Sequence, residues 1–138
     1  MLERPCLHTP ICCCVDFNLN RIRQQFGRVG ISFQRSPDAP NLLTSRNADA
    51  VVQILGEEKD LLRQITLIFK PQVLSIQRQR ALVEAILCST GHSPPLAESL
   101  ASACVGAISE QTPFGLHSGE IDLTVEHLEN GVIFLNAS

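Results

Sequence analysis

Five side chains near the start of the chain could bind a metal: Cys6, His8, Cys12, Cys13 and Cys14. Zinc prefers thiolates and imidazoles that converge tetrahedrally. Adjacent residues of a strand point to opposite faces, so at most two of the three consecutive cysteines could share a site. We therefore expect Cys12–Cys14 to be small apolar residues of a buried strand. A metal or redox site that uses Cys6, His8, Cys12 and Cys14 is one alternative, and S-acylation of the cluster is another.

A second candidate for chemistry is the pair Cys88 and His92, since a thiolate beside an imidazole can act as a nucleophile. The sequence supplies no third group to orient such a pair. It also lacks a P-loop, H-E-x-x-H, G-x-G-x-x-G and G-x-S-x-G. We therefore expect a protein that is not an enzyme, with no catalytic residues and no cofactor.

Charge is distributed unevenly along the chain. No lysine or arginine follows Arg80, whereas residues 81–138 carry seven acidic side chains and residues 1–46 carry six arginines. Such polarity concerns partners rather than fold. The residues that we expect to contact a protein partner are Arg21, Arg23, Arg28 and Arg35 on the basic side, and Asp122, Thr124 and Glu126 on the acidic side.

Nucleic acid is a poor match to this composition. Arginine binds phosphate well, but the pI is about 5.7 and the chain has no Trp or Tyr to stack on bases. No apolar run is long enough to span a bilayer, and the N-terminus does not resemble a signal peptide. We expect an intracellular protein, cytoplasmic or nuclear, whose cysteines stay reduced.

The 138 residues are enough for one domain, which we place over 1–138 with 1–10 as an extended lead-in. Hydrophobic periodicity and turn residues predict the elements in between. They are strands over 11–17 and 29–34, a loop over 36–45, helices over 20–26, 47–65, 75–88 and 94–108, and a C-terminal hairpin over 121–135. The 47–65 helix could also be two shorter helices, because its apolar face breaks at 56–60.

The hairpin is the clearest local pattern. Ile121, Leu123 and Val125 alternate with polar residues, and Asn130-Gly131 follows, a pair that favours a type I′ turn. In the helix before it, small and apolar residues recur at helical spacing, which allows close helix approach inside the core or across a dimer. They are Leu96, Leu100, Ala103, Cys104, Ala107 and Ile108.

These elements predict an α+β fold, with about three helices packed on a small, mainly antiparallel sheet. We expect a protein-interaction or regulatory module that binds a protein partner or a second copy of itself. The arginines of segment 21–46 would meet an acidic surface, either a partner's or the C-terminal part of another copy. Contact of that head-to-tail kind would be heterologous, and the edge of the hairpin offers a second route.

A short C-terminal string resembles a known family. Ile121-Asp122-Leu123, with Glu126, Leu128 and Asn130, is similar to the end of a small accessory protein of adenovirus early region 4. The resemblance lies within residues 121–130. It implies, as an alternative function, a viral accessory protein that assembles into a scaffold and captures host nuclear factors.

Overall fold

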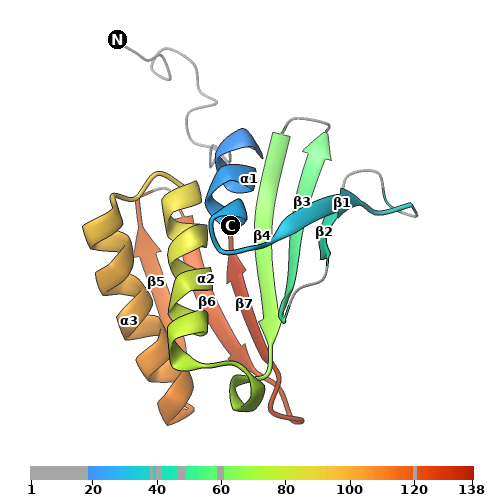
Figure 1. Cartoon of the computed structure of the whole chain (residues 1–138). Coiled ribbons are helices and arrows are strands. Elements are labelled where there is room, and N and C mark those ends of the chain that lie inside the picture. The colour runs from blue at the N-terminus through green and yellow to red at the C-terminus, as the bar shows by residue number, and fades with distance from the viewer. Residues whose placement is uncertain (1–18, 38, 40–41, 47–48, 59–60, 120) are drawn as a thin grey trace.

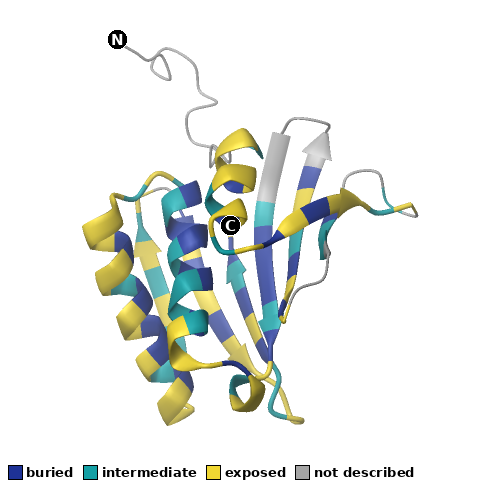
Figure 2. Ribbon diagram, in the orientation of Figure 1, coloured by how far each residue is buried: buried dark blue, intermediate teal, exposed yellow. Residues whose placement is uncertain are grey.

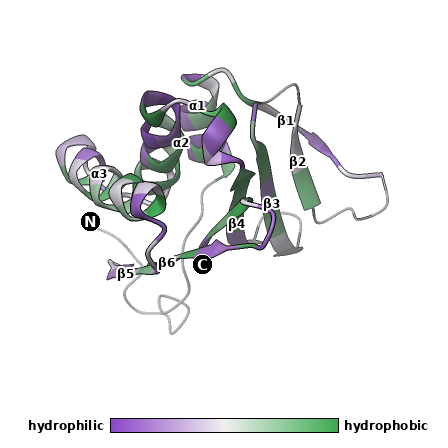
Figure 3. Ribbon diagram, turned by 90° about the horizontal axis from the view of Figure 1, so that it is seen from below, coloured by the Kyte–Doolittle hydropathy of each residue, from purple (hydrophilic) through white to green (hydrophobic). Residues whose placement is uncertain are grey.

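The computed structural model describes residues 19–37, 39, 42–46, 49–58, 61–119 and 121–138. These residues form two layers, a seven-stranded antiparallel sheet and three α-helices on one of its faces (Figure 1, Figure 3). The expected α+β class, with about three helices and a C-terminal hairpin, is confirmed. In chain order the elements are α1 (Leu19–Gly27), β1 (Ser32–Arg35), β2 (Leu42–Arg46), β3 (Val51–Glu58), β4 (Leu61–Phe69), a 3-10 turn η2 (Pro71–Val73), α2 (Ile76–Ser89), α3 (Pro94–Glu110), β5 (Phe114–Ser118), β6 (Ile121–His127) and β7 (Ile133–Ala137).

The strand order is β1-β2-β3-β4-β7-β6-β5, and every neighbouring pair is antiparallel. The sheet therefore consists of two antiparallel ribbons, β1–β4 and β5–β7, that meet where β4 pairs with β7. Helices α2 and α3 connect the ribbons in sequence and cover the sheet between them. The last strand, β7, consequently lies in the middle of the sheet, and β1 and β5 form its edges.

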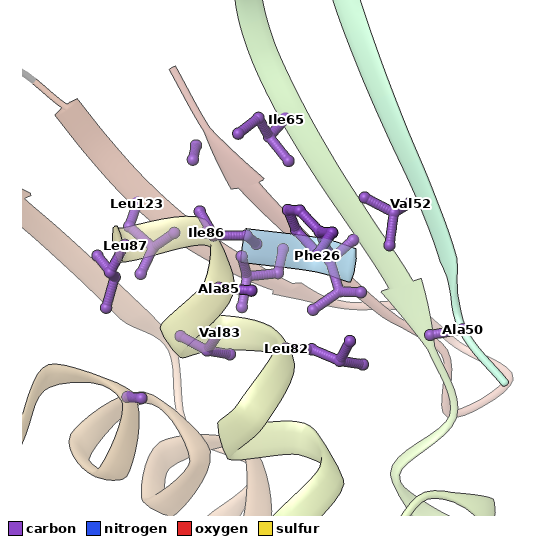
Figure 4. Close-up of a cluster of buried hydrophobic side chains, with 14 of the residues drawn as sticks. Phe26, Ala50, Val52, Ile65, Leu82, Val83, Ala85, Ile86, Leu87 and Leu123 are labelled. Carbon is purple, nitrogen blue, oxygen red and sulfur yellow. The ribbon is translucent and has the colours of Figure 1, made fainter. Parts of the chain in front are cut away.

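The core lies between the helices and the sheet. Alternate strand residues point toward the helices and are buried, and the inner sides of the helices meet them (Figure 2). Figure 4 shows this cluster, in which Phe26 of α1 and Ile86 of α2 lie among side chains of the strands. The cluster is continuous from Phe33 on β1 to Leu123 on β6, so one core supports the whole sheet.

The expected helix over 47–65 is wrong: this segment forms β3 and most of β4. Val52 and Ile54 point into the core with no exposed surface, whereas Val51 and Leu55 are 43% and 39% exposed. Apolar residues on both faces of a strand imitate the spacing of an amphipathic helix. Gly56, where the expected break begins, lies within β3 at a point where the pairing with β4 shifts register.

The expected loop over 36–45 is also partly wrong, because β2 begins at Leu42 and pairs with both β1 and β3. Four strands that the sequence did not predict, β2 to β5, thus enlarge the sheet beyond the small one that was expected. The strand over 11–17 and the lead-in over 1–10 lie outside the described residues.

The three helices that were expected over 20–26, 75–88 and 94–108 are confirmed. Ser75 caps α2, since its hydroxyl accepts a hydrogen bond from the N–H of Arg78 at 3.1 Å. Helix α3 begins at Pro94 and ends at Gln111, which adopts a left-handed conformation with φ 59°. Within the described ranges, none of the helices is both long and apolar enough to cross a membrane.

The apolar face of α3 differs from the one that was expected. Cys104 and Ile108 are buried, together with Ala97, Ala101 and Val105. The other members of the expected face are exposed or only partly buried, and one of them, Leu100, packs against the core. They are Leu96, Leu100, Ala103 and Ala107. Helix α3 therefore carries apolar residues in two directions, of which one faces the sheet.

The hairpin between β6 and β7 is confirmed, but its type I′ turn is wrong. That turn needs positive φ at both central residues, whereas only Gly131 has it, at 82°. Gly131 N–H donates to Leu128 O at 3.1 Å and Leu128 N–H donates to Val132 O at 2.9 Å. The connection is thus a three-residue loop that ends in a left-handed glycine. A Cβ at position 131 would also lie 2.8 Å from Nε2 at the end of the Gln72 side chain, which would have to shift.

One arginine of α2 ties three segments together. Arg78 donates from Nε and Nη2 to the carboxylate of Asp49, at 2.9 and 3.2 Å, and from Nη1 to Val29 O. The hydrogen bond from Arg78 is the main reason that the pKa of Asp49 lies below its ordinary value of 3.8. This arginine therefore joins α2 to the turn before β1 and to the segment before β3.

We expect Arg78→Ala to lower the free energy of unfolding by about 1–2 kcal/mol at neutral pH. Because the folded-state pKa of Asp49 is lowered, the stabilisation is present above pH 3.8 and is lost as the pH falls through the folded-state value. Urea unfolding of both proteins between pH 7 and about pH 2 measures this difference. Arg80→Ala removes the same charge from the same helix and is the control. A difference that stays constant down to the lowest pH would contradict the account of Asp49.

Candidate interaction surfaces

Three of the predicted arginines lie together on the helix layer. Arg21 and Arg23 are exposed on α1, Arg28 is exposed just after it, and the segment 19–28 contains no acidic residue. We call these three residues the α1 arginines. Arg35 is exposed on the edge strand β1 and does not belong to this group. The structure thus brings together three of the four basic residues that the sequence predicted.

Two of the α1 arginines, Arg21 and Arg28, border a groove of about 1030 Å³ between the three helices, whereas Arg23 does not line it. Arg21 and Arg28 line it from α1, and Arg80 and Glu84 line it from α2, one helical turn apart. Glu98 lies on the α3 wall. The groove is thus polar and charged, which is unusual for a small-molecule site, because such pockets are lined mostly by apolar side chains.

The pair Cys88 and His92 is not assembled for catalysis. His92 Nδ1 lies 3.2 Å from Leu87 O, and its Nε2 lies 2.9 Å from Ser118 Oγ. Both ring nitrogens are thus occupied in joining the α2–α3 connection to β5. Burial and then Glu84 raise the pKa of the Cys88 thiol, against a smaller lowering by Arg28. A thiol with a raised pKa is a poor nucleophile.

Cys104 is a core residue. It has no exposed surface, and burial raises the pKa of its thiol to about 12. Its side chain packs in the interior of the helix–sheet interface like a small apolar residue. It therefore has no thiolate at neutral pH with which to do chemistry.

The acidic residues that the sequence predicted lie on the opposite face of the molecule. Asp122, Thr124 and Glu126 alternate with the buried residues of β6 and are exposed on the face of the sheet that points away from the helices. We call these residues the β6 acidic row. Asp122 lies 2.6 Å from His117 Nδ1 on the neighbouring strand β5. The sequence analysis missed β5, and with it this contact.

The same face of the sheet carries exposed apolar residues and a polar network. Val51 and Phe134 are 43% and 36% exposed, and each is a cross-strand neighbour of Ile68. At the centre, Gln64 Nε2 donates to Asn136 Oδ1 at 2.7 Å, and the Thr66 hydroxyl donates to the same oxygen at 2.9 Å. These bonds link the two middle strands, β4 and β7, across this face.

The metal or redox candidates Cys6, His8, Cys12 and Cys14, and the neighbouring Cys13, lie outside the described residues. Elsewhere, in the part of the chain that the structure describes, no group of three or more His, Cys, Asp or Glu residues could hold a metal ion. The chemistry of the N-terminal cluster therefore stays a prediction.

The string that resembles the adenovirus protein lies on β6 and the loop after it. Ile121 and Leu123 are buried in the core, whereas Asp122, Glu126, Leu128 and Asn130 are exposed. Packing of a hairpin against helices accounts for that alternation on its own. Comparisons of the chain with protein families, with curated proteins and with solved structures found no match.

Proposed function

We propose that the protein is a non-enzymatic interaction module that associates head to tail with a second copy of itself. The observation that carries this proposal is the separation of charge between the two layers. The α1 arginines lie on the helix layer, and the β6 acidic row lies on the far face of the sheet. These two groups cannot neutralise each other within one molecule, but they can do so between two copies.

The chemistry of the chain supports an interaction role over catalysis. Cys88 and Cys104 both have raised thiol pKa values, and the ring of His92 is held by backbone and hydroxyl partners. The lining of the helix groove includes the charged side chains Arg28, Arg80 and Glu84. Such a surface gives specificity and fast association with an oppositely charged partner.

The mechanism is charge complementarity between unlike faces. The basic α1 side of one copy would cover the acidic face of the next, so that each copy uses two different surfaces. A contact of this type is heterologous, and its repetition produces a ring or a filament according to the rotation between copies. Because the contact is electrostatic and exposed, salt weakens it.

A charge-swap experiment tests the proposal. We expect association in about 0.05 M salt to weaken about 100-fold in Arg23→Glu/Arg28→Glu, and equally in Asp122→Lys/Glu126→Lys, because each variant has two faces of like charge. A 1:1 mixture of the two variants should associate again, since every acidic face then meets a basic one. Light scattering coupled to size exclusion measures the assemblies, and Ser109→Glu, exposed near the other end of α3 and outside the groove, is the control.

Two outcomes would overturn head-to-tail association. One is a wild-type protein that is monomeric at low salt, and the other is a mixture of swapped variants that stays dissociated. Titration of a fluorescent polyglutamate peptide then separates two cases. Binding that is lost in Arg23→Glu/Arg28→Glu would assign the basic surface to a foreign acidic partner, and an absence of binding would reject an acidic partner as well.

A further inference from the structure

Strand β5 forms one edge of the sheet. It pairs with β6, and no strand among the described residues pairs with its outer side. On the far side of β6, the N–H and C=O of Asp122 exchange hydrogen bonds with Ser138, at 2.8 and 3.0 Å. Backbone groups alternate in direction along an antiparallel strand. Even-numbered residues of β6 therefore turn toward β7, and odd-numbered residues turn toward β5.

This alternation determines which groups of β5 point outward. Leu116 lies opposite Leu123, an odd-numbered residue, so its backbone groups bond inward to β6. Gly115 and His117 must then direct their N–H and C=O groups away from the sheet. The edge thus offers two donors and two acceptors in a row.

The edge at β5 lacks the devices that normally prevent pairing with another chain. Its residues, Phe114 to Ser118, include no lysine, arginine, proline or acid. The opposite edge, β1, is four residues long, ends in Arg35 and is followed closely by Pro37. Short strands, charges and prolines are common protections of sheet edges. Of the two sheet edges that the described residues form, β5 is therefore the less protected, although Pro113 directly precedes it.

Helix α3 adds an apolar surface beside this edge. Figures 1 and 3 show α3 over the β5 end of the sheet. Glu98 and Ser102 line the groove on one side of its buried face. At 100° per residue, the second apolar side lies on the other flank, away from α2. This apolar flank consists of Leu96, Leu100, Ala103 and Ala107, of which Leu96 is 45% exposed.

We propose that a second copy of this chain docks on the β5 edge and the apolar flank about a two-fold axis. The two β5 strands would pair antiparallel, with Gly115 opposite His117 of the second copy. The sheet would continue from one copy into the other, and the two α3 helices would pack side by side. Alanines at 103 and 107 permit the close approach that such packing needs.

The backbone selects this register. It uses all four outward groups of each strand, which gives four hydrogen bonds across the axis. Placing Gly115 opposite Gly115 would set His117 against Pro113, which has no N–H. Placing His117 opposite His117 would set Gly115 against Gly119, whose φ of 65° has left the strand. In the proposed register the imidazole also lies beside a residue without a side chain.

Charge favours a second copy as the occupant. In the dimer the two α3 helices run antiparallel, so Glu110 at the end of one helix lies near the beginning of the other. The first turn of α3 contains no acidic residue, and the N-terminus of a helix attracts negative charge. Within one molecule Glu110 lies at the negative end of its own helix, an arrangement that the second copy would improve.

This inference goes beyond the proposed function, because it uses neither the α1 arginines nor the β6 acidic row. The two contacts also differ in kind. Head-to-tail association is electrostatic and heterologous, whereas the β5 contact is apolar, hydrogen-bonded and isologous. Salt separates them experimentally.

Sedimentation in about 1 M salt, where the Debye length is about 3 Å, tests the inference. We expect the wild type and both charge-swapped variants to remain dimeric. Gly115→Pro removes an outward N–H without altering the bonds to β6, so dimerisation should weaken at least about 100-fold. Ala103→Glu should weaken it similarly, whereas Ser102→Glu, on the groove side of the same helix, should have no effect.

A wild-type monomer in high salt would overturn the inference, whatever happens at low salt. So would a Gly115→Pro protein that is folded by circular dichroism and dimerises like the wild type, or equal effects of Ala103→Glu and Ser102→Glu. A wild type that forms no assembly larger than the dimer at low salt, with the high-salt dimer intact, would reject the proposed function and leave the β5 dimer in place.

Discussion

Replacing Phe26 with alanine is expected to lower the free energy of unfolding by about 3–5 kcal/mol and to release α1 from the sheet. Only two residues of this nine-residue helix are buried, Ile22 and Phe26. A helix of this length has little stability of its own in water. Phe26 has no exposed surface and contacts Phe33 of β1 edge to face, with ring centroids 5.5 Å apart. Phe26→Ala therefore removes one of the two buried side chains that hold α1 against the sheet.

Urea unfolding followed by circular dichroism measures the loss, and hydrogen exchange of the α1 amides measures the release of the helix. Phe134→Ala removes the same side chain from the exposed face of the sheet, where Phe134 is 36% exposed. We expect it to cost less than about 1 kcal/mol. Equal losses in the two variants, or unchanged protection of α1, would show that Phe26 does not anchor the helix.

The basic surface should depend on the same residue. The α1 arginines have fixed positions only while α1 is packed, and Phe26 is the side chain that packs it. If head-to-tail association uses these arginines, Phe26→Ala should weaken association although it changes no charge. The effect of Phe26→Ala on association therefore tests whether the surface that carries the α1 arginines takes part in binding.

The elements that sequence reasoning predicted correctly are those with local signals. Ser75 and Ser93-Pro94 mark the beginnings of α2 and α3, and alternation marks β6. The prediction of a helix over 47–65 was wrong because both faces of β3 carry apolar residues. The sequence therefore shows no clear alternation of apolar and polar residues there. Strand β5 was not predicted because it is short and contains Gly115.

For the candidate sites, too, the residues could be predicted from the sequence but their arrangement in space could not. Residue types and charge identified the α1 arginines and the β6 acidic row, since both are visible as composition. Their separation onto opposite layers could not be predicted, because it depends on which face of the sheet the helices cover. The β5 edge could not be predicted for a related reason, because the edges of a sheet depend on the order of all seven strands. In that order β4 pairs with β7, from which it is separated by more than sixty residues of sequence.

Gln79→Glu is expected to be the most destabilising single-atom change in the connection between the two ribbons. Gln79 is 1% exposed, and its Nε2 donates to Leu74 O at 2.9 Å and to Pro71 O at 3.4 Å. The amide thus holds the turn between β4 and α2. A carboxylate cannot donate, so both carbonyls would lose their donor and would face a buried negative charge. We expect a loss of about 3–5 kcal/mol at pH 8.

The loss should depend on pH with a definite sign. Burial and the two carbonyl oxygens would raise the pKa of the new carboxyl above its unfolded value of about 4.3. The protonated acid can again donate to Leu74 O. The folded form is therefore favoured at low pH, and the deficit relative to wild type should grow as the pH rises through the raised pKa. Urea unfolding of both proteins at pH 4 and pH 8 measures this change.

Gln77→Glu is the matched control, because Gln77 is exposed two residues earlier in the same helix. It adds the same charge to α2 and should change stability by less than about 0.5 kcal/mol at either pH. If Gln79→Glu were as stable as Gln77→Glu at pH 8, the turn would not depend on the amide. The buried Oε1 of Gln79, for which the described residues offer no donor, would then be the more important atom. In that case Gln79→Met should stabilise the protein, because it removes an unsatisfied polar atom.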